Sequence, residues 1–454
     1  RPSMIGVRTI IGYGSPNKAG TADAHGSPLG EEEIERTKDN LGWAADDPFH
    51  VPPKVIDEMR TQVKRGAEMQ RDWERSWDRY ASAHPELAAR MRAALDRKLP
   101  DGWDADLPTF SPDDKPLATR ASSGKALNAI AKHVPWLFGG SADLAGSNDT
   151  LMEGAGSFQA GSYDGRNLHF GVREHAMGSV MNGMAVHGGV RPYGGTFLIF
   201  SDYMRPPIRL AALMEQPTIY VFTHDSVGLG EDGPTHQPVE QLAALRAVPG
   251  LVDMRPADAN ETVEAWRFAM EYVEGPIFFS LTRQGVPNLD RGKLAPASGL
   301  RRGAYILAEA ESGTPEVIII ATGSEVAIAL EAREDLESDG ISTRVVSMPS
   351  MILFERESRE YQDEVLPPEI RARVSVEAGG PMGWHRWIGM DGEIVAITHF
   401  GASAPAKQIF KELGFTAANV ASKARATLGL EHSNAGQEAG RSAAGPAKQG
   451  VDET

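Results

Sequence analysis

The sequence predicts an α/β protein built from successive three-layer α/β domains with mainly parallel sheets. Apolar runs of strand length alternate with amphipathic segments of helix length, and Pro-, Gly- and Asp-rich stretches interrupt this alternation. Strands that alternate with helices are joined by crossover connections, which make neighbouring strands parallel. With 454 residues the chain is long enough for about two to four domain cores.

The first stretch of the chain, residues 1–105, is interpreted as the C-terminal end of one domain. Residues 4–10, MIGVRTI, predict a buried strand, and a Gly/Pro-rich loop leads from it to a helix that opens with EEEIERTKDNL. Charged helical segments follow over 54–98. The Pro- and Asp-rich residues 99–116 predict a linker. Because a buried strand stands so close to residue 1, we expect an N-terminal portion to be missing.

Two further domains are predicted over residues 106–290 and 300–430. In the first, helical segments alternate with the strands LFGGS, TIYVFTH, GLVDMRP and PIFFSLTR. In the second, EVIIIATGSEVAIALEAREDL reads as a strand followed by a helix, and STRVVSM, ARVSVEAG and IVAITHF read as strands. The Gly/Ala-rich residues 431–454 predict a disordered tail.

Composition and charge exclude several classes of function. The formal net charge of -16 argues against nucleic acid or an anionic membrane as the main partner, although a few local Arg and His residues still suit a small anion. The chain has no cysteine, which excludes disulfides, zinc–thiolate sites and cysteine nucleophiles. It shows neither an apolar run of membrane-spanning length nor a signal segment, so we expect no membrane partner and a cytoplasmic location.

The segment FGVREHAMGSVMNGMAVHGG, residues 170–189, places an acid beside an apolar helix face. The face recurs at the i, i+3, i+4, i+7 spacing of a buried stripe and consists of Met177, Val180, Met181 and Met184. Glu174 lies three residues ahead of this stripe. Two structural interpretations stay open, because an acid at a helix start complements the helix dipole and Glu174 can also pair with Arg173. Neither of them explains a carboxylate directed at the core.

The loop after TIYVFTH has a high density of ionisable side chains. It reads HDSVGLGEDGPTHQPVEQ and carries His224, Asp225, Glu231, Asp232 and His236. Ligands bind at the carboxyl ends of strands in open α/β sheets, and histidines beside acids suit binding hydroxyls and moving protons. A solvated loop is the structural alternative. Metal ligation fits less well, because the chain lacks thiols and an HExxH motif.

The same loop contains a literal match to the dinucleotide fingerprint G-x-G-x-x-G, at Gly228–Gly233. That fingerprint requires the glycines to open a helix whose N-terminus receives the pyrophosphate. Pro234 follows at once and Pro238 four residues later, which disfavours immediate helix entry. A nicotinamide-dependent dehydrogenase is therefore the least favoured function.

Aromatic and basic side chains complete the set of candidates. The segment TFLIFSDYMR has aromatic residues three apart, namely Phe197, Phe200 and Tyr203. Core packing is the default interpretation of such spacing, and a flat wall for a heterocycle is the alternative. Three polar residues lie at element boundaries beside small residues, as phosphate binders often do: Arg120, Ser147 and Arg283.

Several segments, in this order, resemble the transketolase family. They are IIGYGSPNKAGTADAHGSPLG, LFGGSADLAGSN, FGVREHAMGSVMNGMAVHGG, YGGTFLIFSDYMR, HDSVGLGEDGPTHQPVEQLAALRAVPGL, SLTRQ, IIATGSEV, VEAG and FGASAP. The resemblance implies a thiamine diphosphate-binding fold followed by a transketolase C-terminal domain. Residues 1–105 would then be the end of the diphosphate-binding domain, 106–290 the pyrimidine-binding domain and 300–430 the C-terminal domain.

The resemblance also implies an activity and a role for the buried acid. Transketolases transfer a two-carbon ketol unit from a ketose phosphate to an aldose phosphate in the pentose phosphate pathway, using thiamine diphosphate and a divalent metal, normally Mg²⁺. Glu174 matches the glutamate that contacts N1′ of the aminopyrimidine. An apolar pocket raises the pKa of a carboxyl, so Glu174 is expected to share a proton with N1′ and favour the imino tautomer. N4′ then removes the C2 proton to give the nucleophilic ylid.

The other site residues are carried over from the same resemblance. Phe200 matches the residue that packs on the pyrimidine, with Phe197 and Tyr203 beside it, and Asp143 resembles an acid near the cofactor. His25 matches a histidine between cofactor and substrate. The positions for phosphate binding and substrate entry are Arg120, Ser147, His224 and Arg283. Asp232 and His236 match binders of the sugar hydroxyls, and His236 is also expected to assist proton transfer.

One departure from the family concerns the diphosphate and metal site. The family's GDG motif and the asparagine after it do not occur in these residues; YDG at 163–165 and EDG at 231–233 lack the first glycine. We therefore expect the metal ligands in a missing N-terminal part, and no metal ligand in this chain. The family's site forms between two subunits, which implies a homodimer or a companion N-terminal half. We expect the chain to be incomplete and inactive alone.

Three alternative functions stay open beside transketolase. A dihydroxyacetone synthase-like enzyme shares most of these motifs, whereas the GEDGPTHQPVEQ loop with His224 and His236 disfavours 1-deoxyxylulose-5-phosphate synthase. A non-catalytic subunit of the same fold is the third alternative. Retention of the candidate site residues, Glu174 among them, argues against that role.

Overall fold

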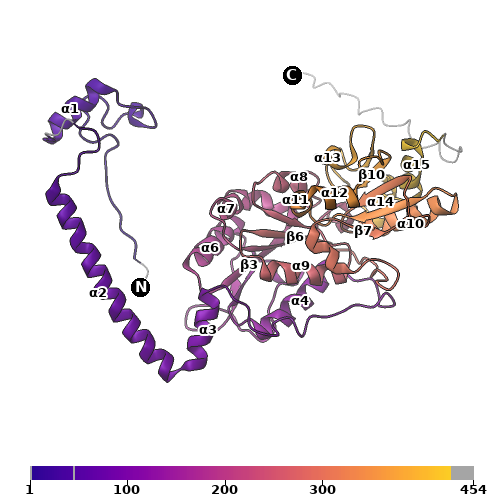
Figure 1. Ribbon diagram of the computed structural model, residues 1–454, viewed down its shortest axis with the longest axis horizontal. Helices are drawn as coiled ribbons and strands as arrows, with labels where there is room; N and C mark the ends of the chain where they lie inside the picture. The colour runs from indigo at the N-terminus through magenta and orange to yellow at the C-terminus, as the bar shows by residue number, and fades with distance from the viewer. Residues whose placement is uncertain (1–2, 44–46, 431–454) are drawn as a thin grey trace, which may run out of the picture. The chain divides into compact units, whose positions relative to one another are not determined.

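Figure 1 shows the computed structural model, which describes residues 3–43 and 47–430. By its internal contacts the chain divides into two compact units, Arg1–Ala88 and Ala89–Thr454. The tail that the sequence predicts to be disordered, residues 431–454, lies outside the described residues.

The first unit consists of a loop-rich stretch and two long helical segments. The 3-10 helix η1 (Ala22–Ala24) precedes α1 (Glu31–Leu41), and α2 (Pro53–Ala83) follows. The carboxylate of Glu33 in α1 accepts hydrogen bonds from the hydroxyl of Ser15 and, at 2.8 Å each, from the backbone and side-chain amides of Asn17. The bond from Ser15, followed by those from Asn17, lowers the pKa of Glu33 to about 2. This acid therefore fixes the loop against the helix.

The strand predicted over residues 4–10 is absent from the structure. These residues have no regular secondary structure, and the side chains of Met4 and Ile5 are 98% and 85% exposed. A strand needs a neighbouring strand to pair its backbone N–H and C=O groups. The described residues of the first unit contain no strand to pair with, so the prediction from apolar composition alone was wrong.

The second unit contains two sheets, of which the first has six parallel strands in the order β2-β1-β3-β4-β6-β5. These strands are β1 (Leu137–Ser141), β2 (Asn167–His169), β3 (Arg191–Phe197), β4 (Ile219–Thr223), β5 (Val252–Met254) and β6 (Ile277–Leu281). Parallel pairing places their carboxyl ends at one edge of the sheet, and the loops that leave this edge carry most of the predicted site residues.

Helices cover both faces of the first sheet. One face is covered by α4 (Thr119–His133) and α9 (Ala259–Glu271), the other by α6 (Glu174–His187), α7 (Ser201–Leu213) and α8 (Gln241–Arg246). Alternate residues of β4 supply the two cores: Ile219 and Val221 pack on the first face, and Tyr220 and Phe222 on the second. The predicted linker, 99–116, has no helix or strand, yet it buries Trp103 in the first of these cores.

The second sheet has five strands in the order β11-β10-β8-β9-β7, with β7 antiparallel to β9. These strands are β7 (Tyr305–Ala308), β8 (Val317–Ala321), β9 (Thr343–Ser347), β10 (Arg373–Val376) and β11 (Glu393–Val395). Helices α10 (Glu325–Ser338) and α15 (Ala417–Thr427) cover one face. Helices α11 (Met351–Arg356), α12 (Arg359–Val365) and α13 (His385–Ile388) cover the other.

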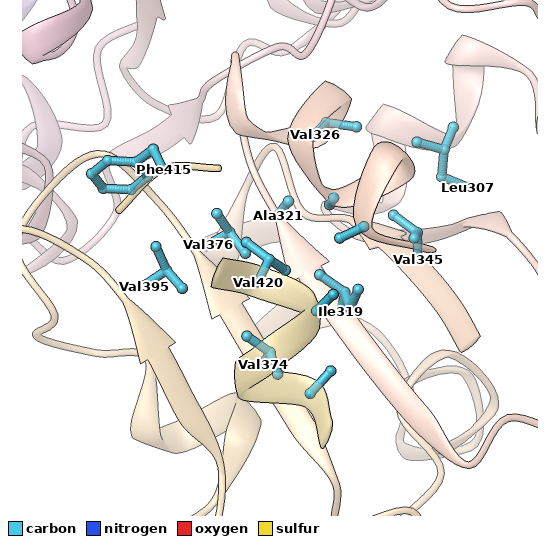
Figure 2. Packing of buried hydrophobic residues seen from close by; sticks show 14 of the residues in the cluster. Leu307, Ile319, Ala321, Val326, Val345, Val374, Val376, Val395, Phe415 and Val420 are labelled. Atoms are coloured by element: carbon cyan, nitrogen blue, oxygen red, sulfur yellow. The ribbon is translucent and has the colours of Figure 1, made fainter. Parts of the chain in front are cut away.

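The core of the second sheet explains why its central strands read as continuous apolar runs. On β8 the side chains of Ile319 and Ala321 face Val420 of α15 and Val326 of α10 (Figure 2). The intervening Ile320 enters the core on the opposite face. A strand covered by helices on both faces needs apolar residues at every position. The α/β class with successive three-layer, mainly parallel sheets is thereby confirmed.

Candidate active site

The predicted site residues of the second unit follow the carboxyl ends of neighbouring strands. Asp143 and Ser147 follow β1, Phe200 follows β3, His224 follows β4 and Arg283 follows β6. Glu174 comes five residues after β2, where it is the first residue of α6. Because these strands are adjacent in the sheet, the topology gathers residues that are far apart in the sequence.

Glu174 is a buried acid on the core-facing side of α6. Its side chain is 7% exposed, on the same helix face as the fully buried Met177 and Met181. The carboxylate accepts a hydrogen bond from the hydroxyl of Thr196, 3.4 Å away on β3. The predicted stripe is correct for the two methionines, whereas Val180 lies 46% exposed outside it. The acid therefore faces the sheet, as the sequence predicted.

A stack of aromatic rings begins at Phe197, the residue that follows Thr196, the hydrogen-bond partner of Glu174. Phe197 stacks on Phe200 with ring centroids 5.7 Å apart, and on the imidazole of His224 at 3.7 Å. Tyr203 lies 6.1 Å from Phe200, at a tilted angle. The edge of His236 meets both phenylalanines, at 6.1 Å from Phe197 and 5.6 Å from Phe200. Phe197 is 8% exposed but Tyr203 is 64% exposed, so the stack runs from the core to the surface.

His224 combines burial with an unfavourable backbone conformation. Its φ angle is 59°, in the left-handed region that a side chain makes costly, and Asp143 and Asp149 also have positive φ angles, of 62° and 52°. Burial lowers the pKa of His224 to about 3, and Arg120, Arg283 and His236 act in the same direction. The imidazole is therefore neutral near pH 7, in a region of positive potential.

A chain of hydrogen bonds begins at Nδ1 of His224 and extends into the buried interior. Thr223 lies 2.8 Å from Nδ1 of the imidazole and donates to Oδ1 of Asn148 at 2.9 Å. The amide of Asn148 donates to the hydroxyl of Ser141, which is 2.7 Å from that of Thr150. All of these polar side chains are buried, and their hydrogen bonds tie the end of β4 to the segment after β1.

Arg120 is brought to the same edge of the sheet by the start of α4. Thr119 and Thr282 exchange backbone-to-hydroxyl hydrogen bonds of 2.9 and 2.7 Å, which tie α4 to the end of β6. The guanidinium of Arg120 donates to the backbone oxygen of Ser147 at 2.5 Å and lies 3.8 Å from the carboxylate of Asp149. Burial lowers the pKa of Arg120, as does Arg283 nearby, while Asp149 opposes the change. Two guanidinium groups thus share one neighbourhood, which suits a doubly charged phosphate.

The loop after β4 does not open a helix at its glycines. A short 3-10 helix, η3 (Val227–Leu229), is followed by turns that end at His236, and α8 begins only at Gln241. This arrangement agrees with the rejection of a dinucleotide fingerprint. Asp232 is exposed on this loop, and His236 is half-buried with Nδ1 3.0 Å from the hydroxyl of Thr235.

The structure brings together only part of the predicted set. Glu174, Phe197, Phe200, Tyr203, His224, His236, Arg120, Ser147 and Arg283 form one neighbourhood. Asp143 and Asp232 are exposed, and neither bonds to another predicted residue in the described part of the chain. His25 follows η1 in the first unit, where it is exposed, so its predicted role stays a prediction.

Sequence reasoning missed the polar residues beneath the site. Ser141 and Asn148 lie within LFGGSADLAGSN, which was noted only for Asp143 and Ser147, and Thr196 precedes the noted Phe197. Single hydroxyl and amide side chains inside apolar strands give no periodic signal. The available clue was position: Ser141 and Thr196 lie at the carboxyl ends of β1 and β3, and Asn148 ends the short helix that follows β1.

Comparison with known protein families assigns most of the chain. Residues 1–100 match the transketolase thiamine diphosphate binding domain, residues 115–288 the transketolase pyrimidine binding domain, and residues 303–416 the transketolase-like C-terminal domain. The chain belongs to the transketolase family. The match over residues 1–100 means that the chain does carry residues of the diphosphate-binding domain. The expectation that most of this domain is missing has no support from the comparisons.

Similar transketolases include curated bacterial proteins and solved structures. The chain is 52% identical over 430 residues to the transketolase of Geobacillus stearothermophilus and 47% identical over 429 residues to that of Bacillus subtilis; each match covers 94% of this chain and 64% of the relative. A transketolase structure from Pichia stipitis in complex with xylulose 5-phosphate aligns with a TM-score of 0.86 at 40% identity, over 92% of this chain and 62% of that one. The chain thus spans less than two thirds of the length of these transketolases.

Two further observations on the described residues concern membranes and metal ions. No helix within residues 3–43 and 47–430 is long and apolar enough to cross a membrane. Over the same residues, no three His, Asp or Glu side chains gather as metal ligands would.

Proposed function

We propose that this chain supplies the pyrimidine-binding half of a transketolase site, which transfers a two-carbon ketol unit from a ketose phosphate to an aldose phosphate. The observation that carries the proposal is the buried carboxylate of Glu174 at the start of α6, which accepts a hydrogen bond from Thr196, the residue before Phe197 of the aromatic stack. Sequence identity of about half to proteins named transketolase supports it.

The residues present fit the aminopyrimidine of thiamine diphosphate. The carboxylate of Glu174 has one hydrogen-bond partner among the described residues, at 3.4 Å, so it has capacity left for a ring nitrogen. Phe200 and Tyr203 offer flat apolar surface for a heterocycle. When bound, thiamine diphosphate supplies a carbon nucleophile and an electron sink. Glu174 holds or releases a proton at the ring nitrogen, and burial shields that proton from water.

The basic and histidine side chains bind the sugar phosphate substrate. Arg120, Ser147, His224 and Arg283 bind the phosphate and line the entry, because two guanidinium groups beside a buried imidazole attract a dianion. Asp232 and His236 bind the sugar hydroxyls, and His236 assists proton transfer there. His25 and Asp143 are assigned to the cofactor, and His25 also to the substrate, by resemblance alone.

The wider setting is proposed on the same family basis. Residues 1–105, 106–290 and 300–430 are taken as the end of the diphosphate-binding domain, the pyrimidine-binding domain and the C-terminal domain. Mg²⁺, a cytoplasmic location, a place in the pentose phosphate pathway and a homodimer complete the proposal. Within residues 3–43 and 47–430 no three His, Asp or Glu side chains gather as metal ligands would, so the ligands of Mg²⁺ are assigned to residues outside this set.

We also propose that the 454 residues alone are inactive and need diphosphate-binding residues from another chain. A solved structure of a split gene transketolase, described as an inactive β4 tetramer, supports such a division: it aligns with a TM-score of 0.57 at 27% identity, over 70% of this chain and all of that one. Ketol transfer by the isolated chain with added thiamine diphosphate and Mg²⁺ would overturn it.

The decisive experiment is a ketol-transfer assay with xylulose 5-phosphate as donor. The 454-residue chain is combined with a diphosphate-binding domain, and Glu174→Gln is compared with Glu153→Gln, which changes an exposed acid. We expect Glu174→Gln to lower kcat by about 100-fold or more and Glu153→Gln to leave it unchanged. Equal activity of the two variants would contradict the role of Glu174. Preference for formaldehyde over ribose 5-phosphate as acceptor would instead indicate a dihydroxyacetone synthase.

A further inference from the structure

The loop that carries three predicted substrate contacts is held by the domain of the second sheet. We call residues 224–240 the substrate loop; it contains His224, Asp232 and His236. Its own hydrogen bonds are short-range turns, such as His236 N–H to the Gly233 oxygen at 3.0 Å. Contacts within the loop therefore do not fix its position relative to the sheet.

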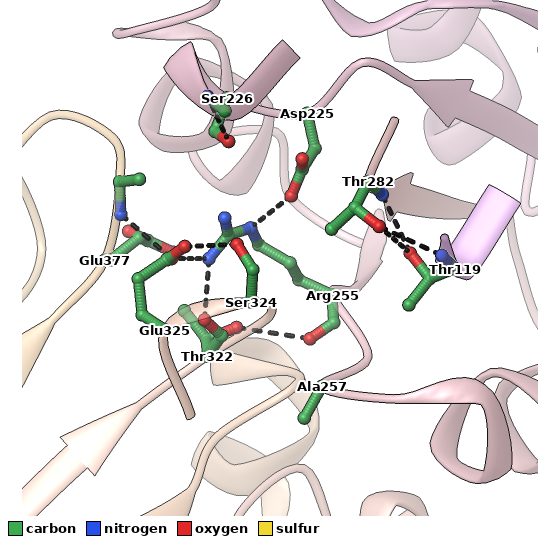
Figure 3. A network of polar contacts seen from close by, with 12 residues as sticks. Thr119, Asp225, Ser226, Arg255, Ala257, Thr282, Thr322, Ser324, Glu325 and Glu377 are labelled. Carbon is green, nitrogen blue, oxygen red and sulfur yellow. Dashed lines mark hydrogen bonds and ion pairs between the residues drawn. The ribbon is translucent and has the colours of Figure 1, made fainter. Parts of the chain in front are cut away.

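Arg255 connects the start of the substrate loop to the second domain. This arginine follows β5 and is 1% exposed. Its Nε donates to Asp225, the residue next to His224, at 2.9 Å. Its Nη1 donates to the Thr322 oxygen at 2.7 Å and to the carboxylate of Glu325 at the start of α10 (Figure 3). One guanidinium thus joins the substrate loop to the turn that follows β8.

The Glu325 end of this connection is itself firmly held. Its carboxylate accepts from the hydroxyl of Ser324 at 2.5 Å and from the backbone N–H of Ala378 at 3.0 Å. The turn also binds the main chain of Arg255, because Gly323 N–H donates to the Arg255 oxygen at 3.1 Å. A side chain at Gly323 would meet the Arg255 guanidinium at 2.6 Å, so a glycine is required for this close approach. Both ends of the arginine are therefore fixed.

Two more contacts hold the middle and the end of the substrate loop. The side-chain amide of Gln237 donates to the Gly230 oxygen at 3.0 Å and to the Ala402 oxygen at 2.9 Å. Farther along, Gly380 N–H donates to the oxygen of Val239 at 2.7 Å. Residues 380 and 402 both lie in the second domain. The loop is thus held by that domain at its start, middle and end.

The contacts on both sides of His224 maintain a backbone conformation that is otherwise unfavourable. A non-glycine residue with a φ of 59° stays in that conformation only where its neighbours determine it. Thr223 fixes one side through Asn148, and Asp225 fixes the other through Arg255. Releasing Asp225 would let His224 relax toward a commoner conformation and turn its imidazole away from Phe197.

We propose that Arg255 is a positioning residue, which acts through Asp225 to hold His224 in the geometry that binds substrate, so that the domain of the second sheet braces the substrate loop. The link to substrate rests on the proposed function. The bracing of the loop stands on the contacts alone and can be measured without activity.

Hydrogen exchange of the substrate loop tests the brace directly. The variant is Asp225→Asn, because removing Arg255 would leave buried carboxylates uncompensated and risk unfolding. The matched control is Glu261→Gln, which also changes a buried carboxylate bonded across to the second sheet, through Tyr305 and Ser347. We expect amides of residues 226–237 to exchange about tenfold faster in Asp225→Asn, with β4 and α9 unchanged. Glu261→Gln should leave the loop amides as in the unchanged chain.

A kinetic measurement on the enzyme assembled with a diphosphate-binding domain tests the link to substrate. Asp225→Asn should raise KM for the phosphorylated acceptor about tenfold while kcat changes less than about threefold. Glu325→Gln should act in the same direction, and Glu261→Gln should leave KM unchanged. Arg255→Lys, which keeps the positive charge and one donor beside these carboxylates, should retain part of the loop protection that Asp225→Asn loses.

The experiments test three statements separately: the bracing of the loop, the positioning of His224 for substrate, and the proposed function. Unchanged loop exchange in Asp225→Asn, or an equal rise throughout residues 89–430, would overturn the brace. Faster loop exchange without any change in KM would overturn the positioning of His224 for substrate. If the enzyme without substitutions binds thiamine diphosphate but transfers no ketol unit, the proposed function is contradicted. The hydrogen-exchange result would then still show whether the second domain holds the substrate loop.

Discussion

The imidazole of His224 lies against the ring of Phe197, with centroids 3.7 Å apart and planes inclined by 28°. Because the stack and the surrounding protein bury the imidazole, protonating it would place a charge in a poorly solvated space. Arg120 and Arg283 add to that cost. The aromatic stack and the basic residues thus act together to keep this histidine neutral.

The neutral state of His224 predicts a pH dependence of stability. The folded-state pKa, about 3, lies below the ordinary histidine value of 6.5, so the unfolded chain binds a proton that the folded chain does not. This contribution to stability is complete above pH 6.5 and is lost as the pH falls towards 3, by at most about 1.4 kcal/mol per pH unit. Urea unfolding between pH 7 and 5 should show a shallower loss for His224→Gln than for His187→Gln, which changes an exposed histidine. Parallel pH profiles of the two variants would contradict the prediction.

The polar network beneath His224 predicts a strict requirement for glycine at position 195. A side chain at Gly195 would meet the Ser141 hydroxyl at 2.5 Å and the Asn148 amide at 3.0 Å. We expect Gly195→Ala to lower the free energy of unfolding by about 1–3 kcal/mol, as overpacking does. Gly146→Ala is the control, since a side chain there meets open space. A thermal or urea unfolding series in which both variants match the unchanged chain would refute the requirement.

Removing an acid from a buried ion pair should lower the free energy of unfolding more than removing one from an exposed pair. Glu377, 1% exposed, accepts two hydrogen bonds from Arg246 and one from Trp384. We expect Glu377→Ala to cost about 3–5 kcal/mol, because it leaves a buried guanidinium undercompensated. Glu357→Ala removes an ion pair to Arg302 at the surface and should cost less than about 1 kcal/mol. Urea unfolding of the two variants measures both values, and equal costs would show that burial does not set the contribution.

The basic side chains of the site predict a selective loss of phosphate binding. Arg120→Met should weaken binding of ribose 5-phosphate about tenfold or more, because it removes a charged donor, and leave binding of ribose unaffected. Lys125→Met changes an exposed cation on the same helix and serves as the control. Isothermal titration at low and moderate salt measures the affinities. A similar loss of affinity for both sugars would instead indicate a change in the shape of the site.

The elements that were predicted correctly are those whose burial leaves a clear pattern. Strand β8, VIIIA, and helix α9 could be read from sequence because helices cover both faces of the strand and one face of the helix packs on the sheet. Strand β3, RPYGGTF, was not recognised, since its Pro and two Gly residues are poor strand formers. A side chain at Gly194 would collide with Met177 and Met181 of α6, and one at Gly195 with Ser141 and Asn148, so both glycines are required by close packing. Residues 4–10 show the opposite error, in which apolar composition suggested a strand without a partner.

The candidate site was predictable to the extent that it lies at strand ends. Glu174 and His224 were predicted as site residues from their positions in the sequence, whereas the pairing of Asp225 with Arg255 was not predicted. Asp225 had been noted as one charge of a loop, and Arg255 lies 30 residues farther along, after a different strand. Which of many charged residues meet in the interior depends on how the two sheets pack together, and that information is absent from local pattern. Supporting residues are therefore harder to predict than the residues they support.

The bracing contacts from residues 322–325, 380 and 402 have a consequence for dividing this chain. A fragment of residues 89–290 would retain the first sheet, and with it Glu174, His224 and His236. It would lose the partners of Arg255 and Gln237, so the same side chains would be present on a loop free to take other conformations. The smallest piece that contains the site's chemical groups is therefore shorter than the smallest piece that can hold them in place.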